Sequence, residues 1–224
     1  MPSPHVFRLG WNREKLAEYL LSRISFVAKP STVSDDLGSD FFCTLFRLDK
    51  RDNREYASPL SSFAIQIKSN SRIQDFTTNI KYLYDLEIPF FWGVLNEKNK
   101  SLTVYSGENL PVFFSLVDMP KTLRIKPLDR DQVEAPSEPN EPRREDYTVM
   151  FPKILELGVD SEKEELEKGT SALHQMCRLM HANIATRRTE EYIFEGYDEG
   201  SVTNGTAVAK PLPVLDLRLS EFLS

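Results

Sequence analysis

The sequence predicts an α/β protein in which helices flank a mixed β-sheet. Apolar residues recur at helical spacing between Asn12 and Ile24, strand-like runs follow, and a second helical stretch precedes the continuous apolar run "PFFWGVLN". A run of this kind is typical of a buried central strand. Because "SLTVYSG" follows it after a short turn, the order is helix, three strands, helix and two strands. That order favours helices layered on one sheet.

The first half of the chain gives these elements in sequence. Asn12 can cap the first helix, and Glu14 near its start suits the helix dipole. Residues 26–40 are interpreted as a strand or loop, because Pro30 and the "DDLG" stretch carry turn chemistry. We then expect a strand at 40–48, a polar turn at 49–59, a strand at 61–69, a helix at 71–87 that buries Phe76, Ile80, Leu83 and Tyr84, and a strand or short helix at 110–117.

The C-terminal half has a different character. Residues 126–146 contain four prolines and many charges, which predicts a linker or surface loop. Residues 161–188 have helical spacing, and "EEYIFEGY" and "TAVAKPLPVLDL" favour a hairpin around "DEGSVTNG". The expected organisation is a main domain at 1–125, a linker at 126–146, and an extension of one helix and a hairpin at 147–224.

Composition restricts the classes of protein that fit. The chain has 224 residues, of which 40% are apolar and 28% charged, as in ordinary globular proteins. Its net charge of −6 argues against a protein that coats DNA non-specifically. The two cysteines, Cys43 and Cys177, suggest neither a disulfide framework nor a zinc site. Without an apolar signal core or a membrane-length run, we expect a cytoplasmic protein with no membrane contact.

Four polar residues fall at informative places in this order. Gln66 and Lys68 share one face of their strand, because strand side chains alternate. Asp40 opens the preceding strand. If the two strands are antiparallel neighbours, the start of one lies beside the end of the other, and Asp40 comes close to Gln66 and Lys68. Glu18 lies on the first helix.

These motifs resemble the PD-(D/E)xK nuclease superfamily. The segments "LAEYLLSRI", "DLGSDFFCTL" and "SSFAIQIKS" match its helix with a glutamate, its acidic turn and its strand with the Gln-x-Lys motif. The pattern is similar to the branch with glutamine in place of the second acid, found in Mrr-like restriction endonucleases. The resemblance covers about residues 11–107. It implies a restriction-endonuclease-like fold, a mixed sheet flanked by helices, that carries the helix and hairpin as a C-terminal extension.

The resemblance also implies a metal-dependent nuclease. Asp40 would be the principal ligand of Mg²⁺ or Mn²⁺, with the side-chain oxygen of Gln66, the carbonyl of Ile67, and Glu18 directly or through water. Lys68 would orient or deprotonate the attacking water and stabilise the developing charge. The expected substrate is DNA rather than RNA, in prokaryotic defence against foreign nucleic acid. The acidic balance suggests targeting by a protein partner or a homodimer through the C-terminal half.

Other interpretations stay open at this level. The chain fits a catalytically inactive scaffold or interaction subunit, which its net negative charge and the C-terminal half outside the resemblance suggest. The glutamine also removes a negative charge from the metal site, which should lower metal affinity. It also fits an unrelated α/β fold in which the four residues never meet. Asp35 and Asp36 are read as a polar turn rather than as ligands. His174 and His181 are read as ordinary helix positions, and Phe90 to Trp92 as core rather than a base-stacking surface.

Overall fold

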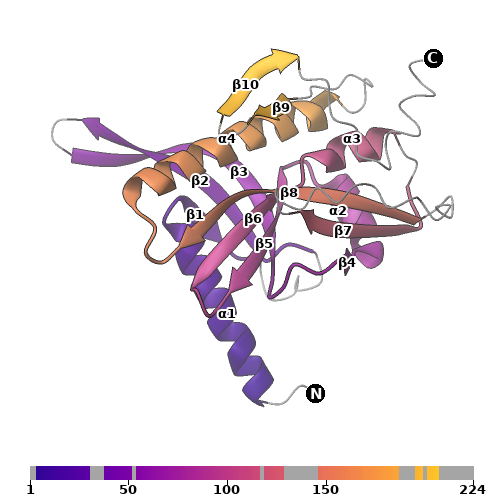
Figure 1. Cartoon of the computed structure of the whole chain (residues 1–224), viewed down its shortest axis with the longest axis horizontal. Helices are drawn as coiled ribbons and strands as arrows, with labels where there is room; N and C mark the ends of the chain where they lie inside the picture. The colour runs from indigo at the N-terminus through magenta and orange to yellow at the C-terminus, as the bar shows by residue number, and fades with distance from the viewer. Residues whose placement is uncertain are drawn as a thin grey trace.

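The structure, a computed structural model, is an α/β fold built on an eight-stranded mixed sheet flanked by helices (Figure 1). It describes residues 4–30, 38–51, 54–116, 119–128, 146–186, 195–198 and 201–206. The elements are α1 (Pro4–Ser22), β1 (Ser25–Ala28), β2 (Phe41–Arg51), β3 (Arg54–Lys68), β4 (Gln74–Asp75), η2 (Thr77–Asn79), α2 (Ile80–Asp85), β5 (Phe90–Asn96), β6 (Ser101–Ser106), α3 (Asn109–Leu116), β7 (Thr122–Leu128), β8 (Asp146–Gly158), α4 (Lys163–Thr186), β9 (Glu195–Asp198) and β10 (Ser201–Thr206).

The sheet has the strand order β1-β2-β3-β5-β6-β8-β7-β4. Strands β1, β2 and β3 are antiparallel neighbours, as the sequence predicts for the second and third strands. The chain then crosses through α2, and β5 pairs in parallel with β3. Strands β5, β6 and β8 continue antiparallel, and β7 pairs in parallel with β8. The far end of the β2–β3 hairpin extends beyond the rest of the sheet (Figure 1).

Two hydrophobic cores lie on the two sides of this sheet. Neighbours along one strand divide between them: Ile65 belongs to one core and Ala64 to the other, which is the alternation that a strand imposes. The first core, here the α1/α4 core, joins α1 and α4 to β2, β3, β5 and β6. The second, the α2/α3 core, joins α2 and α3 to β5, β7 and β8. The buried run Phe90 to Trp92 contributes side chains to both cores, so its aromatic rings belong to the core as expected.

Several element boundaries differ from the prediction. Helix α1 begins at Pro4, so Asn12 lies inside the helix and does not cap it. The ladder of β2 and β3 continues to the pair Arg51 and Arg54, so the expected turn at 49–59 is wrong over most of its length. The predicted helix 71–87 shortens to α2 because Asp75 is in β4 and its Oδ1 accepts the N–H of Thr77 at 2.8 Å, a local turn that precedes the helix. Of the two alternatives for 110–117, the helix is observed as α3.

The C-terminal half contains strands that the prediction missed. Strands β7 and β8 join the main sheet, and residues 126–128 of the predicted linker lie in β7, while 129–145 lie outside the described residues. Helix α4 is observed as predicted and packs in the α1/α4 core. The hairpin exists, but its second strand is β10, within the stretch expected to form the turn. Residues 207–217 of the expected second strand lie outside the described residues.

The described helices include none that is long and apolar enough to cross a membrane.

The two cysteines test whether α4 shares a core with the N-terminal strands. Cys43 on β2 and Cys177 on α4 are free, buried and in the same core. Burial raises the pKa of Cys43 from its usual 9.0 to about 12, and burial likewise raises the pKa of Cys177. Near neutral pH we expect both thiols to react on the order of a thousand-fold more slowly in the native than in the denatured protein. Colorimetric thiol titration measures this, and rapid native reaction of one thiol would show that α4 is not packed on β2.

Candidate functional site

The candidate site lies where β2 begins and β3 ends. The antiparallel register places Phe41 opposite Ile65, so the residue before β2 falls beside the last residues of β3. The buried side chains of Phe41, Phe63 and Ile65 hold this register in the α1/α4 core. The strand pairing therefore brings Asp40 to Gln66, the contact that the sequence order predicts.

Asp40 makes three hydrogen bonds to β3. Its N–H donates to the carbonyl of Ile65 at 2.9 Å. Its Oδ2 accepts the backbone N–H of Ile67 at 2.6 Å and the amide Nε2 of Gln66 at 2.8 Å. The Asp40 carboxylate thus accepts the Ile67 N–H, a backbone donor of β3 that lies beside the start of β2. Hydrogen bonds to an ionised acceptor are the stronger kind, so the side chain is held in one place.

A tight turn delivers Asp40 to this position. Gly38 has φ +91°, a left-handed conformation that side chains with a Cβ rarely adopt. A Cβ built on Gly38 would lie 3.0 Å from Nδ2 of Asn79 and 3.1 Å from Cδ1 of Tyr82, so the turn is pressed against η2 and α2. The next residue, Ser39, is 5% exposed and accepts a hydrogen bond from the hydroxyl of Tyr82 at 2.8 Å.

Gln66 and Lys68 lie on the face of β3 that looks to the α2/α3 core, as does Ala64. Ile65 and Ile67 lie on the other face and pack in or against the α1/α4 core, as predicted. Gln66 is 9% exposed, so its amide is nearly enclosed. Lys68 is partly buried, and its amine forms no ion pair with any carboxylate in the described ranges. A cation therefore ends the strand that carries the amide.

Trp92 of β5 is the cross-strand neighbour of Gln66 in the parallel register. Its side chain is fully buried, and its indole N–H has no acceptor among the described residues. An unmet buried donor of this kind costs about 1–3 kcal/mol. The polar amide of Gln66 therefore lies beside buried apolar side chains. Its hydrogen bond to Asp40 offsets part of the free-energy cost of burying the amide.

Glu18 is not part of these hydrogen bonds. It lies on α1 with 41% of its side chain exposed, and its Oε2 pairs with Nζ of Lys29 at 2.9 Å. Lys29 also pairs with Glu14 at 3.1 Å, and the hydrogen bond that Lys29 donates to Glu18 is the largest cause that raises the pKa of Lys29. The structure thus brings together Asp40, Gln66 and Ile67 and gives Glu18 a separate partner.

The two histidines considered from sequence have ordinary hydrogen-bond partners, whereas Asp35 and Asp36 lie outside the described residues. Nδ1 of His174 contacts the hydroxyl of Ser61 at 2.8 Å, and Nδ1 of His181 contacts the carbonyl of Cys177 at 2.9 Å. In the part of the chain that the structure describes, no three His, Cys, Asp or Glu side chains group as a metal cluster.

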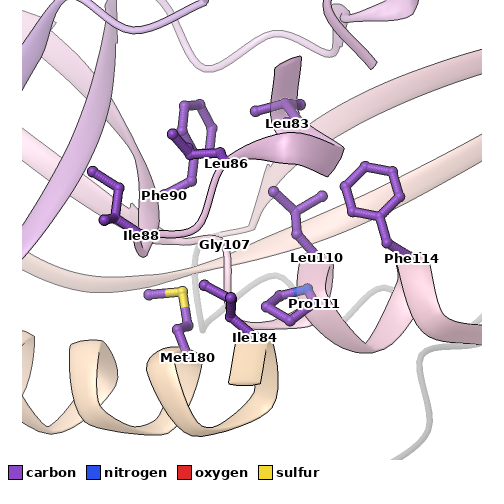
Figure 2. Close-up of a pocket in the computed structure, with 10 residues that line it drawn as sticks. All are labelled: Leu83, Leu86, Ile88, Phe90, Gly107, Leu110, Pro111, Phe114, Met180 and Ile184. Atoms are coloured by element: carbon purple, nitrogen blue, oxygen red, sulfur yellow. The ribbon is translucent and has the colours of Figure 1, made fainter. Parts of the chain in front are cut away.

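A pocket elsewhere in the fold is not the candidate site. Figure 2 shows it between α2, β5, α3 and α4, with side chains such as Leu83, Phe90, Leu110 and Met180 turned toward it. Every lining residue is apolar or glycine, so the pocket holds no group for acid–base or metal chemistry.

The sequence did not reveal the residues that pack around the turn before Asp40. Ser39, Asn79 and Tyr82 surround the turn, and only the glycine before Ser39 signalled that a turn was present. Nothing in the sequence distinguishes Tyr82 from Tyr84, because the contact depends on how α2 is placed over the turn.

Gly38→Ala should destabilise the protein by roughly 1–3 kcal/mol, because the substitution forces a Cβ into a left-handed conformation against Asn79 and Tyr82. Gly169→Ala is the matched control. Gly169 lies inside α4, and its Cβ would meet Leu155 only at an ordinary 3.5 Å, so this change should stabilise by about 0.5–1 kcal/mol. Urea denaturation measures both, and equal effects of the same sign would contradict the strained turn.

No protein-family model matches this chain, and no curated protein or solved structure matches it either.

Proposed function

We propose that the protein is a metal-dependent phosphodiesterase, a nuclease with a restriction-endonuclease-like fold that acts on DNA. One observation supports this above the others: the carboxylate of Asp40 is hydrogen-bonded to Gln66, with Lys68 on the same face of the same strand. The Asp40 carboxylate and the Gln66 amide thus meet where β2 begins and β3 ends, and Lys68 lies two residues further along β3. The element order from α1 to β6, with the short strand β4 added before α2, follows the order that the sequence pattern predicts.

The donor set suits a hard cation. Asp40 offers a carboxylate, toward which Gln66 and Ile67 turn N–H groups in the structure. The Gln66 amide would therefore have to rotate to place its oxygen on a cation. After that rotation, its oxygen and the Ile67 carbonyl are neutral ligand types that Mg²⁺ and Mn²⁺ accept alongside water and substrate oxygens. A metal ion held there would offset charge on the phosphoryl oxygens. Glu18 would join only by leaving Lys29, so we assign it a secondary role.

Lys68 acts on the attacking water and on the developing charge in this proposal. Its amine is a cation at the end of β3, two residues beyond the amide that contacts Asp40. From there it would orient the attacking water and stabilise negative charge as the phosphodiester bond breaks. The absence of a carboxylate partner in the described ranges supports this role, because an ion pair would hold the amine away from water and substrate.

The biological setting rests on the resemblance alone. DNA is the proposed substrate in preference to RNA, in cytoplasmic defence of a prokaryotic cell. Because the net charge is −6, targeting to DNA would come from a protein partner or from a homodimer through the C-terminal half.

A second candidate function is a non-catalytic interaction subunit that keeps the same fold. Exposed apolar side chains on the first strands favour it: Phe26 is 52% exposed and Leu48 47% exposed. The ring of Phe26 lies 5.1 Å from that of Phe46, so β1 and β2 present apolar area to solvent. Apolar area of this kind is typical of contact surfaces between proteins.

Metal titration and DNA cleavage separate these functions. Mn²⁺ at ten times its Kd should stabilise the wild type by about 1.4 kcal/mol, and Asp40→Ala should abolish both that gain and cleavage. Lys68→Ala should keep the metal-dependent gain but lose about 100-fold or more in cleavage rate, since it removes only the group that acts on the attacking water and the developing charge. Lys81→Ala changes an exposed lysine on α2 and is the matched control. A wild type that neither gains stability from Mn²⁺ nor cleaves DNA would favour the interaction subunit, and equal cleavage by the wild type and Lys68→Ala would contradict the role of Lys68.

Gln66→Glu tests why the site has an amide. The substitution replaces the donor to Asp40, now 2.8 Å away, with a second carboxylate. Without metal the pair should share a proton, which raises one pKa above its unfolded value, so stability should fall by about 1–3 kcal/mol as pH rises from acidic to neutral. Mn²⁺ should reverse this loss and bind more tightly than to wild type. Urea denaturation at acidic and neutral pH, with and without Mn²⁺, gives the four values, and a pH-independent loss that metal does not reverse would contradict the site.

A further inference from the structure

We propose that Tyr82 is a positioning residue that fixes the carboxylate of Asp40 through Ser39. The proposal deepens the proposed function and rests on it for any effect on metal binding, whereas the positioning of Asp40 is testable without metal.

The contact between Tyr82 and Ser39 joins α2 to the turn before β2. The Tyr82 hydroxyl donates to Oγ of Ser39 at 2.8 Å, and Ser39 is almost completely buried. Burial raises the pKa of Tyr82, so the hydroxyl keeps its proton at neutral pH and remains a donor. Because Ser39 precedes Asp40 directly, a shift of Ser39 moves the residue that carries the carboxylate.

The turn is held from two sides. On one side, α2 and η2 press against Gly38, where a Cβ would come within 3.1 Å of the Tyr82 ring. On the other side, Asp40 is bonded to Ile67 and Gln66 of β3. Those bonds hold the carboxylate only while the backbone of the turn keeps its distance from β3. The contact of Ser39 with Tyr82 on α2 fixes that distance. Removing the hydroxyl releases one of the two sides.

The amide of Ile67 reports directly on this arrangement. Its N–H donates to Oδ2 of Asp40 at 2.6 Å, so hydrogen exchange at Ile67 measures how firmly the carboxylate is held. A purely structural role for Tyr82 would change exchange throughout α2 and the sheet and would not single out Ile67.

The experiment compares Tyr82→Phe, Ser39→Ala and the double variant by amide hydrogen exchange in the absence of metal. Tyr84→Phe on the same helix is the matched control, because its partly exposed ring packs against Phe114. We expect exchange at Ile67 to rise about tenfold in each single variant, with no further rise in the double variant, because both remove the same link. Tyr84→Phe should leave Ile67 unchanged.

Unchanged exchange at Ile67 in Tyr82→Phe, or additive effects in the double variant, would overturn the positioning role. A Mn²⁺ titration of the same proteins then tests the consequence: affinity should fall about tenfold in Tyr82→Phe, the usual effect of removing a residue that orients a ligand. If exchange responds as expected but the wild type shows no Asp40-dependent metal binding, the positioning stands and the proposed nuclease function fails.

Discussion

The register between β2 and β3 is the constraint on which the candidate site depends. Side chains alternate along a strand, so a slip of one residue would turn Gln66 and Lys68 into the α1/α4 core and Ile65 out of it. The buried ring of Phe41 makes that slip costly, because it would lose its apolar surroundings while an amide and a cation entered them. The hydrophobic pattern that folds the sheet therefore also decides which polar groups meet Asp40.

The turn before β2 connects this register to the second side of the sheet. Helix α2 is held in the α2/α3 core by Ile80 and Leu83, and it carries Tyr82 between them in the sequence. Because α2 belongs to the crossover between the parallel strands β3 and β5, the strand that carries Gln66 leads through β4 and η2 into the helix whose Tyr82 contacts Ser39. The position of the Asp40 carboxylate therefore depends both on the packing of α2 in the α2/α3 core and on the pairing of β2 with β3.

The sequence predicted the parts of this arrangement that depend on local pattern. The apolar period located α4 and β5, and the pairing of β2 with β3 followed from their order, which brought Asp40 to Gln66. It did not predict β7 and β8, because their pairing is parallel, each strand contains a proline, Pro127 or Pro152, and a charged proline-rich stretch separates them. The Lys29 partner of Glu18 and the Tyr82 contact were missed for a related reason: each joins elements through tertiary packing, which single-sequence spacing does not record.

The amide of Gln66 has a physical consequence for how the site behaves before it binds anything. Two adjacent acids repel each other and must share a proton or hold a cation, whereas an amide donates to the carboxylate and leaves a single negative charge. The Asp40–Gln66 pair is therefore stable without metal, and it satisfies a buried polar group next to Trp92. For the proposed metal site the cost would be weaker attraction for a cation, so its occupancy would depend more on substrate oxygens. Under the proposed function, a site of this kind would bind its metal best when DNA is already present.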